Sequence, residues 1–598
     1  MWQKVLFCIG QRVNPFLLFI FLSAMVLLSM EQSGCTRVSV EDRKFSKMVD
    51  EFFEYYLRVN PTWATGIGAH QYDGLLDDLG QDAIEARTQN LRSYLERMQE
   101  IDTTGLSLAN KIDYQILGNN IRRELFELEE LRGWQRNPLL YNYIIGGSIY
   151  SLICRNFAPC DERLANVISR LRQIPRLLKQ AKANLDNPPR IYTETAIKQN
   201  RGTIKLIRED LAKLADSVPR LKKELEVEIQ KVVTALEGYQ KFLENELLPR
   251  SKGNFRLGNE LYRKKLRYTL QSDLTPEEIV ERAEKEYVRV REEMYQLALP
   301  IHQQVYYDHK HKEKGEALKN IIIREVLNLI AGEHPQKDEL LDVCRKILND
   351  LEKFVKNKEI IDLSGINPLV VEWQPEFSRG VTVAGLDAPG PLDRKQQSFY
   401  RVSPIPEDWT ADQIESFLRE YNYYMLQDLS IHEAIPGHYV QLYYANRFPS
   451  LVRTIFGSGT FIEGWAVYAE RMMLEEGYGN FDPKLKLMQL KMYLRSIINA
   501  IIDVKIHTQN MSKREAMRLM IEGGFQEESE ARDKWIRACL TSAQLTTYFV
   551  GVQEVLDLKK EYKKLKGDKF NLKEFHEKLL SYGSPPIKYL RQILLKID

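Results

Sequence analysis

The chain has 598 residues, of which 44% are hydrophobic and 28% are charged. These values are ordinary for globular proteins, and they exclude wholesale disorder and a polytopic membrane protein. The 85 lysines and arginines nearly balance the 83 aspartates and glutamates, so the net charge is only +2. We therefore expect no nucleic-acid partner, which a strongly basic chain would favour.

The first 35 residues have the features of an export signal. Lys4 and Arg12 precede an apolar run over residues 16–30. A helix of this length rises about 22 Å, short of the ~30 Å hydrocarbon core of a membrane. Small residues directly before Cys35 resemble a bacterial lipoprotein processing site, although Gln32 stands where an aliphatic residue is usual. The sequence predicts export to the periplasm or cell envelope, with a lipid on Cys35 as the sole membrane contact. Cleavage elsewhere, or an uncleaved anchor, is the alternative.

Helical periodicity extends from about residue 40 to residue 356, where apolar residues recur at three- and four-residue spacing. A helix should begin after Thr275, because this capping residue is followed by a proline and two acids. The charged segment 307–315 is predicted to be a loop. We interpret His309 and His311 within it as solvated side chains rather than metal ligands.

Six cysteines are too few for a fold that depends on disulfides. Cys154 and Cys160 are close enough in sequence to pair in an oxidising compartment. Cys344 and Cys539 lie in helical patterns and are predicted to be buried thiols.

Residues 361–406 break the helical pattern with repeated prolines and glycines. Short β-type runs at 369–371, 381–383 and 398–402 predict a small sheet with tight turns. Helical periodicity returns at Thr410, which can form a capping box with Gln413.

Two of the nine histidines lie in one motif, which runs from His432 through Glu433 to His438. Glu463 follows downstream. Two imidazoles and a carboxylate suit a catalytic Zn²⁺ with one position open for water. Glu433, beside the first histidine, is then the candidate general base.

The spacing of these histidines differs from that of the usual zinc-peptidase motif, in which positions i and i+4 share one helical face. On a regular helix, a histidine at i+6 points about 120° away from the first. Pro436 and Gly437 disfavour a continuous helix. The metal interpretation therefore requires a turn that brings His438 back toward His432. Otherwise these are two unrelated histidines near a helix end, and Glu433 is a surface charge.

The third ligand has two candidates, Glu463 and Glu470. They share one face of a helix about 10 Å apart along its axis, so only one can reach the metal. We favour Glu463, whose Glu-Gly-Trp-Ala context resembles that of the third ligand in some zinc aminopeptidases. Glu470 then orients a ligating histidine, or is a surface charge.

A polar stripe marks the following helix, which is otherwise strongly apolar and should be buried. Arg495, Asp503 and His507 recur on it at multiples of four residues. The stripe is either a structural ladder of hydrogen bonds or a functional feature in which His507 stabilises an oxyanion. Tyr548 is a second candidate for that role, with a core aromatic as the alternative. Arg379 and Arg495 could bind a substrate carboxylate, and a buried ion pair is equally consistent.

These motifs together resemble the bacterial family called domain of unknown function 885, whose members are often predicted lipoproteins. The resemblance covers most of the mature chain and rests on the histidine motif, Glu463–Glu470, and further matches at Pro61–Thr65, Gly68, Tyr72-Asp73, Arg379-Gly380, Pro389–Leu392, Asp503, His507, Gln544, Tyr548 and Gly551. The family is similar to zinc peptidases with two histidines and a glutamate. The resemblance implies a mostly helical fold and metallopeptidase activity, with His432, His438 and Glu463 binding the metal.

The expected fold is mainly α, a large multi-helical zinc-peptidase-like structure with one small β-sheet near the active site. We expect a signal over residues 1–35, a helical part over 36–360, and a catalytic part over 361–598 that contains the sheet. The helical part and the catalytic part are expected to form one continuous structural unit. The expected function is zinc-dependent hydrolysis of short peptides. The alternatives are a metal-dependent hydrolase of another amide or ester, and a non-catalytic envelope binding protein on the same fold.

Overall fold

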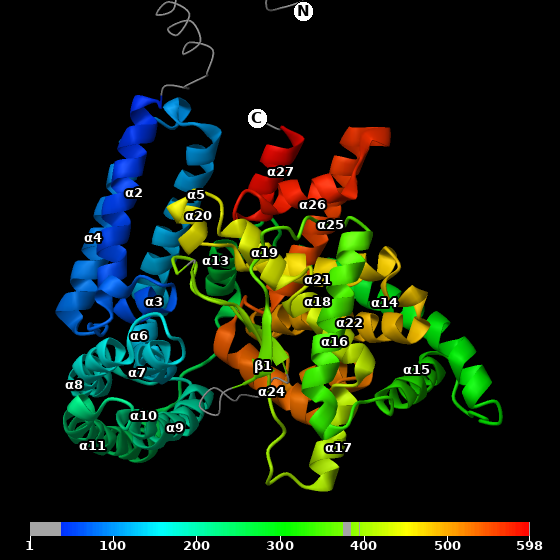
Figure 1. Ribbon diagram of the computed structural model, residues 1–598, viewed down its shortest axis with the longest axis horizontal. Coiled ribbons are helices and arrows are strands. Elements are labelled where there is room, and N and C mark those ends of the chain that lie inside the picture. Colours follow the sequence, from blue (N-terminus) through cyan, green and yellow to red (C-terminus); the bar gives the residue numbers. More distant parts are fainter. Residues whose placement is uncertain (1–37, 375–383, 394, 597–598) are drawn as a thin grey trace, which may run out of the picture.

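The computed structural model describes residues 38–374, 384–393 and 395–596. The described part of the chain is mainly helical and has one three-stranded sheet, as expected from the sequence (Figure 1). The predicted signal over residues 1–35, including Cys35, lies outside the described residues. None of the described helices combines the length and the apolar composition that crossing a membrane requires.

The N-terminal helices occupy the left side of Figure 1. They are α2 (Val40–Val59), α3 (Pro61–Gly66), α4 (Gln81–Gln99), α5 (Leu108–Phe126), α6 (Gly133–Arg136), α7 (Pro138–Ile153), α8 (Cys160–Asn184), α9 (Arg190–Lys205), α10 (Leu211–Ala215), α11 (Pro219–Phe242) and α12 (Leu248–Arg250).

The remaining helices form the larger body on the right and in the centre of Figure 1. They are α13 (Gly258–Leu270), α14 (Pro276–Val305), α15 (Glu316–Ala331), α16 (Leu340–Asn357), α17 (Ala411–Glu420), α18 (Tyr423–Glu433), α19 (His438–Ala445), α20 (Leu451–Ile455), α21 (Gly459–Glu475), α22 (Pro483–Thr508), α23 (Lys513–Arg518), α24 (Glu528–Thr541), α25 (Thr546–Lys566), α26 (Leu572–Leu580) and α27 (Ile587–Leu595).

Three hydrophobic clusters form the core of the described residues. The largest extends from Tyr262 of α13 to Leu594 of α27, so the predicted boundary at residue 360 falls within it. A second joins α7, α8, α9 and α11. The third joins α2, α4 and α5 and also includes Val452 and Phe456, from around α20. The first helices of the chain therefore pack directly against the C-terminal part.

Local sequence signals account for several helix starts. Thr275 caps α14 in a capping box with Glu278, and Thr410 caps α17 in a capping box with Gln413, so both predictions are confirmed. Helix α22, predicted to be buried, is buried along almost its whole length. Because apolar side chains surround this helix, its polar residues must find partners inside the protein.

The sheet consists of β1 (Val370–Trp373), β2 (Ala384–Asp387) and β3 (Phe399–Val402), in the order β1-β3-β2. Strand β3 lies parallel to β1 and antiparallel to β2. The predicted runs at 369–371 and 398–402 correspond to β1 and β3. The run at 381–383 lies outside the described residues, which resume with β2.

The N-terminal helices hold this sheet in place. Arg155, just after α7, donates hydrogen bonds to the carbonyl oxygens of Asp387 and Gln397, at 2.7 and 2.8 Å. Between β2 and β3, the Leu392 amide donates to the carbonyl oxygen of Ile67 at 2.9 Å. Further along the chain, the buried Arg453 guanidinium donates to the Asp113 carboxylate at 2.6 Å. Both halves of the chain therefore contribute to one structure.

Cys154 and Cys160, which are close enough in sequence to pair, do not form a disulfide, because both are free thiols. The Cys154 thiol donates to the Ser151 carbonyl oxygen, one turn earlier. The Cys160 thiol contacts the Ser217 hydroxyl, between α10 and α11. Cys344 and Cys539 are buried, as predicted. Burial raises the pKa of both of their thiols to about 12.

Helices α21 and α25 approach closely enough for their backbones to touch. A Cβ on Gly464 would overlap the backbone of Gly551, whereas one on Gly459 meets no atom of the described chain within 4 Å. We expect Gly464→Ala to lower the free energy of unfolding by about 1–3 kcal/mol, because the helices must separate. Urea denaturation measures this, with Gly459→Ala as the control. Equal stability of the two variants would contradict the close packing.

Candidate metal centre

A tight turn joins the two histidines of the motif. Helix α18 ends at Glu433 and α19 begins at His438, with a cis peptide bond between Ile435 and Pro436. A Cβ on Gly437 would overlap the carbonyl oxygens of the preceding helix end, so glycine is required there. The break that the spacing demanded is present, and it returns His438 to the side of His432.

The structure brings His432, His438 and Glu463 together. The Nε2 atoms of His432 and His438 lie 3.7 and 3.6 Å from Oε2 of Glu463. The three donor atoms lie within 4.8 Å of one another. In tetrahedral zinc sites, bonds of 2.0–2.2 Å place neighbouring donor atoms about 3.3–3.6 Å apart. The donor set therefore suits zinc, and the separations from Glu463 lie at or just above the upper end of this range.

Glu470 contacts the outer nitrogen of the first histidine. The Nδ1 atom of His432 lies 2.6 Å from Oε1 of the buried Glu470 and donates to it. Glu463, not Glu470, faces the space between the two histidines. Glu470 occupies the place that a carboxylate takes when it fixes the orientation of a ligating imidazole.

Buried ionisable groups surround this centre. Burial disfavours the imidazolium form of His432, but hydrogen bonds to Glu463 and Glu470 outweigh it and raise the pKa of His432. Burial likewise disfavours the carboxylate of Glu463, but hydrogen bonds with the two histidines lower its pKa below the usual value. Burial and the neighbouring Glu470 charge raise the pKa of Asp428, which the sequence did not single out. The lowered pKa of Glu463 keeps its carboxylate in the charged form, which is the form that binds a metal.

Removing the outer carboxylate tests its orienting role. We expect Glu470→Ala to weaken zinc binding about 10- to 100-fold, as loss of such a partner does in other zinc sites. Glu470→Gln keeps a hydrogen-bond acceptor and should lose less. Competition with a chromophoric chelator measures the affinity. Glu475→Gln, on the same helix, is the control, and unchanged affinity in Glu470→Ala would rule out the role.

Glu433 lies at the meeting point of α18 and the sheet. Its Oε2 accepts a hydrogen bond of 3.2 Å from the backbone amide of Leu386 in β2. The carboxylate is thus held next to the first histidine and at the edge of the sheet. Its role as a general base remains a prediction.

His507 is engaged elsewhere. Its Nε2 donates to the Ala538 carbonyl oxygen at 2.9 Å, and its ring stacks on Tyr262 with centroids 5.6 Å apart. Burial lowers the pKa of His507, which favours the neutral ring. A neutral imidazole has one N–H, and here Ala538 receives it. The structure therefore corrects the prediction that His507 donates to an oxyanion.

Asp503, on the same stripe, has a structural role. Its carboxylate accepts hydrogen bonds of 2.8 Å from the amides of Ala543 and Leu545, just before α25, and one of 3.1 Å from the Tyr262 hydroxyl. Arg495 forms ion pairs with Glu420 and Glu530. The polar stripe is thus a structural ladder of polar contacts, the first of the two interpretations of the sequence. The Arg495 guanidinium is engaged in ion pairs within the protein.

Tyr548 remains a candidate. It lies one turn before Gly551, which packs against Gly464, the neighbour of Glu463 in the chain. Its hydroxyl accepts a hydrogen bond of 3.2 Å from Arg537, which leaves its own proton for donation. Arg379, the other proposed carboxylate clamp, lies outside the described residues.

The prediction that His309 and His311 are solvated is confirmed for His309, whose side chain is 43% exposed, and is wrong for His311, whose side chain is 16% exposed. Both histidines lie close to His302 and Glu325, and the four side chains form a second group of potential ligands. The alternation His-x-His was the available signal, and their partners on two helices were not visible in the sequence.

Comparison with known proteins agrees with the resemblance noted from the motifs. The profile of the family described as bacterial protein of unknown function (DUF885) matches residues 61–594. A predicted lipoprotein of unknown function from Shewanella oneidensis is 35% identical, with a TM-score of 0.80 over 92% of this chain and 99% of that one. A predicted lipoprotein from Colwellia psychrerythraea has the same fold, with 19% identity and a TM-score of 0.77 over 94% and 99% of the two chains. No curated protein matches the sequence. The chain therefore belongs to the DUF885 family.

Proposed function

We propose that the protein is a zinc-dependent peptidase that hydrolyses the peptide bonds of short peptides. The observation that carries the proposal is the convergence of His432, His438 and Glu463 beside Glu433. The two histidine nitrogens lie 3.7 and 3.6 Å from the Glu463 oxygen, close to the separation in a tetrahedral zinc site, and three protein ligands leave a fourth position open. The hydrogen bond between Nδ1 of His432 and Glu470 adds a carboxylate that orients the imidazole, as in many zinc sites.

The chemistry divides between the metal and the protein. Zinc, when bound, supplies a Lewis acid that polarises a carbonyl group and lowers the pKa of water to about 7. Glu433 accepts the proton of the attacking water and returns it to the leaving amine. Leu386 holds the Glu433 carboxylate through its amide. Tyr548 is the proposed donor to the oxyanion.

The sheet favours a peptide over other substrates. Strand β2 is at the edge of the sheet, paired only with β3 among the described strands. The Leu386 amide points away from β3, toward Glu433. Glu433 occupies the Leu386 amide, so an extended peptide would add through the other outward-facing backbone groups of β2, with its scissile bond beside Glu433. Main-chain pairing of this kind recognises peptides without regard to their side chains.

We further propose an envelope location. The signal-like segment and the small residues before Cys35 support export and lipidation, and both structural relatives are described as predicted lipoproteins. Mass spectrometry of the mature N-terminus would identify a lipid on Cys35, and a free N-terminus at another residue would contradict it.

Metal content tests the centre, and a peptide library tests the activity. We expect the native chain to bind zinc that His432→Ala loses, and to hydrolyse short peptides only when that zinc is present. If the protein cleaves only esters or non-peptide amides, it is a metal-dependent hydrolase of another class and not a peptidase. Equal zinc content in both proteins would show that His432 does not bind zinc and would rule out the proposed metal centre. A non-catalytic binding protein on this fold would then be the better interpretation.

A further inference from the structure

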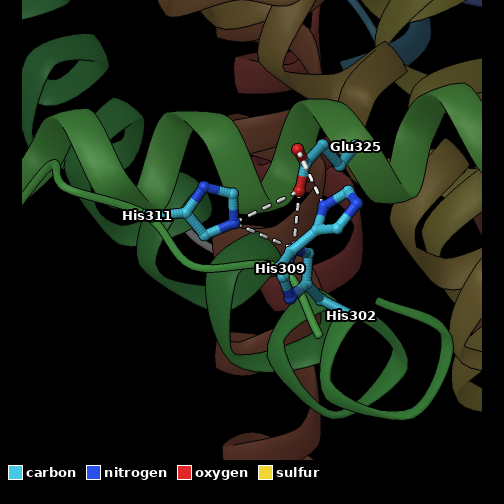
Figure 2. A group of neighbouring side chains, drawn as sticks. All are labelled: His302, His309, His311 and Glu325. Carbon is cyan, nitrogen blue, oxygen red and sulfur yellow. Dashed lines mark hydrogen bonds and ion pairs between the residues drawn. The ribbon is translucent and has the colours of Figure 1, made fainter. Parts of the chain in front are cut away.

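A second set of potential metal ligands lies at the junction of α14 and α15 (Figure 2). His302 comes from the last turn of α14, His309 and His311 come from the loop that follows, and Glu325 comes from α15. The four donor atoms lie within 4.8 Å of one another. These residues share no member with the centre at His432 and come from different elements.

The two helices fix two of the four donors. His302 is buried, and its Nε2 lies 2.6 Å from Oε2 of Glu325. Helices α14 and α15 pack against each other on either side of the loop, on the right of Figure 1. The helices thus supply one buried imidazole and one carboxylate, and the two loop histidines would complete a set of four ligands.

The loop supplies the other two donors on one side. His309 and His311 alternate with Lys310 and Lys312, as residues of an extended segment do when they face opposite ways. The Nδ1 atom of His309 lies 3.5 Å from Oε1 of Glu325, and the Nε2 atom of His311 lies 3.5 Å from Oε2. The lysines are exposed, so their ammonium groups stay in solvent.

The separation of the two inner nitrogens is compatible with a shared metal. The Nε2 atoms of His302 and His311 lie 3.3 Å apart. Two nitrogens bound to one tetrahedral zinc at 2.0–2.1 Å lie about 3.3–3.4 Å apart. In the contact with Glu325, His302 Nε2 carries the proton that it donates to the carboxylate. Loss of that proton would free the lone pair of Nε2 to bind a cation placed between these groups.

We infer that His302, His309, His311 and Glu325 form a second zinc site. Three imidazoles and one carboxylate fill the four positions of tetrahedral zinc, and this leaves none for water or substrate. The site is therefore structural. It fastens the loop over residues 306–315 to α15, and the hydrogen bond between His302 and Glu325 is the contact that zinc replaces.

The loop carries its own reporter, because trypsin cleaves after Lys310, Lys312 and Lys314. Mass spectrometry of timed digests, with and without zinc chloride, gives the cleavage rate at these three bonds alone. At a free zinc concentration about ten times the dissociation constant, cleavage in the native chain should slow roughly tenfold, because the bound loop opens less often.

The variants separate this site from the other one. Zinc should not slow loop cleavage in His309→Ala/His311→Ala, which removes two ligands from an exposed loop and leaves the helices intact. Protection should persist in His432→Ala, which lacks the proposed catalytic zinc, and in His334→Ala, which replaces a histidine outside both groups. Glu325→Gln should lose protection as the double variant does. A cleavage rate in the native chain that does not respond to zinc, or protection that survives the double variant, would overturn the site.

Discussion

Replacing Glu433 with glutamine is expected to lower kcat/KM for peptide hydrolysis about 10²- to 10⁴-fold while zinc stays bound. Glutamine is nearly isosteric, and its side-chain oxygen can still accept the hydrogen bond that Leu386 gives to Glu433. It cannot accept a proton at neutral pH. The loss should therefore fall on the proton-transfer step, with the metal ligands in place.

Steady-state kinetics and metal analysis on the same preparations test this expectation. Glu475→Gln is the control, because it makes the same chemical change on an exposed part of α21, where Glu475 pairs with Arg471. Native zinc content with lost activity assigns the base to Glu433. Full activity in Glu433→Gln would reject the proposed mechanism, even with the metal centre intact.

Gly437→Ala is expected to abolish zinc binding at the centre and, with it, hydrolysis. The added Cβ would overlap the carbonyl oxygens of Ile431 and His432, so the turn must open. Opening it moves His438 away from Glu463, since α19 begins at His438 immediately after the turn. Loss of one of three ligands leaves two donors, too few for a stable site.

The measurement is zinc content together with circular dichroism, which shows that the helices remain. Gly459→Ala is the matched control, because its Cβ meets no atom of the described chain within 4 Å. Zinc retained at the His432 centre in Gly437→Ala would mean that the turn is not what brings the two histidines together. The loop site at His302 should keep its metal in both variants.

Features set by local chemistry were predictable from the sequence. The capping boxes at Thr275 and Thr410 satisfy backbone groups within one turn, so their partners are close in sequence. The break between His432 and His438 follows from Pro436 and Gly437, which disfavour a continuous helix.

Features set by packing were not predictable. His507 donates to Ala538, on α24, and only the position of that helix decides how the imidazole is used. Strand β2 contains Gly385 and Asp387, residues with low β-propensity, and its pairing with β3 overrides that preference. Propensity and periodicity carry no information about such partners.

The contacts that hold the sheet and the C-terminal part against the first helices also bear on the order of folding. Arg155 and Asp387 are 232 positions apart in the chain, and Asp113 and Arg453 are 340 apart. Closing such long loops costs entropy before any contact repays it, which slows folding. The hydrophobic cluster that contains α2 also includes Val452 and Phe456, so it cannot be completed until more than 450 residues have been synthesised. We therefore expect the N-terminal helices to remain incompletely packed in early folding intermediates, and zinc capture at His432 to mark one of the last steps.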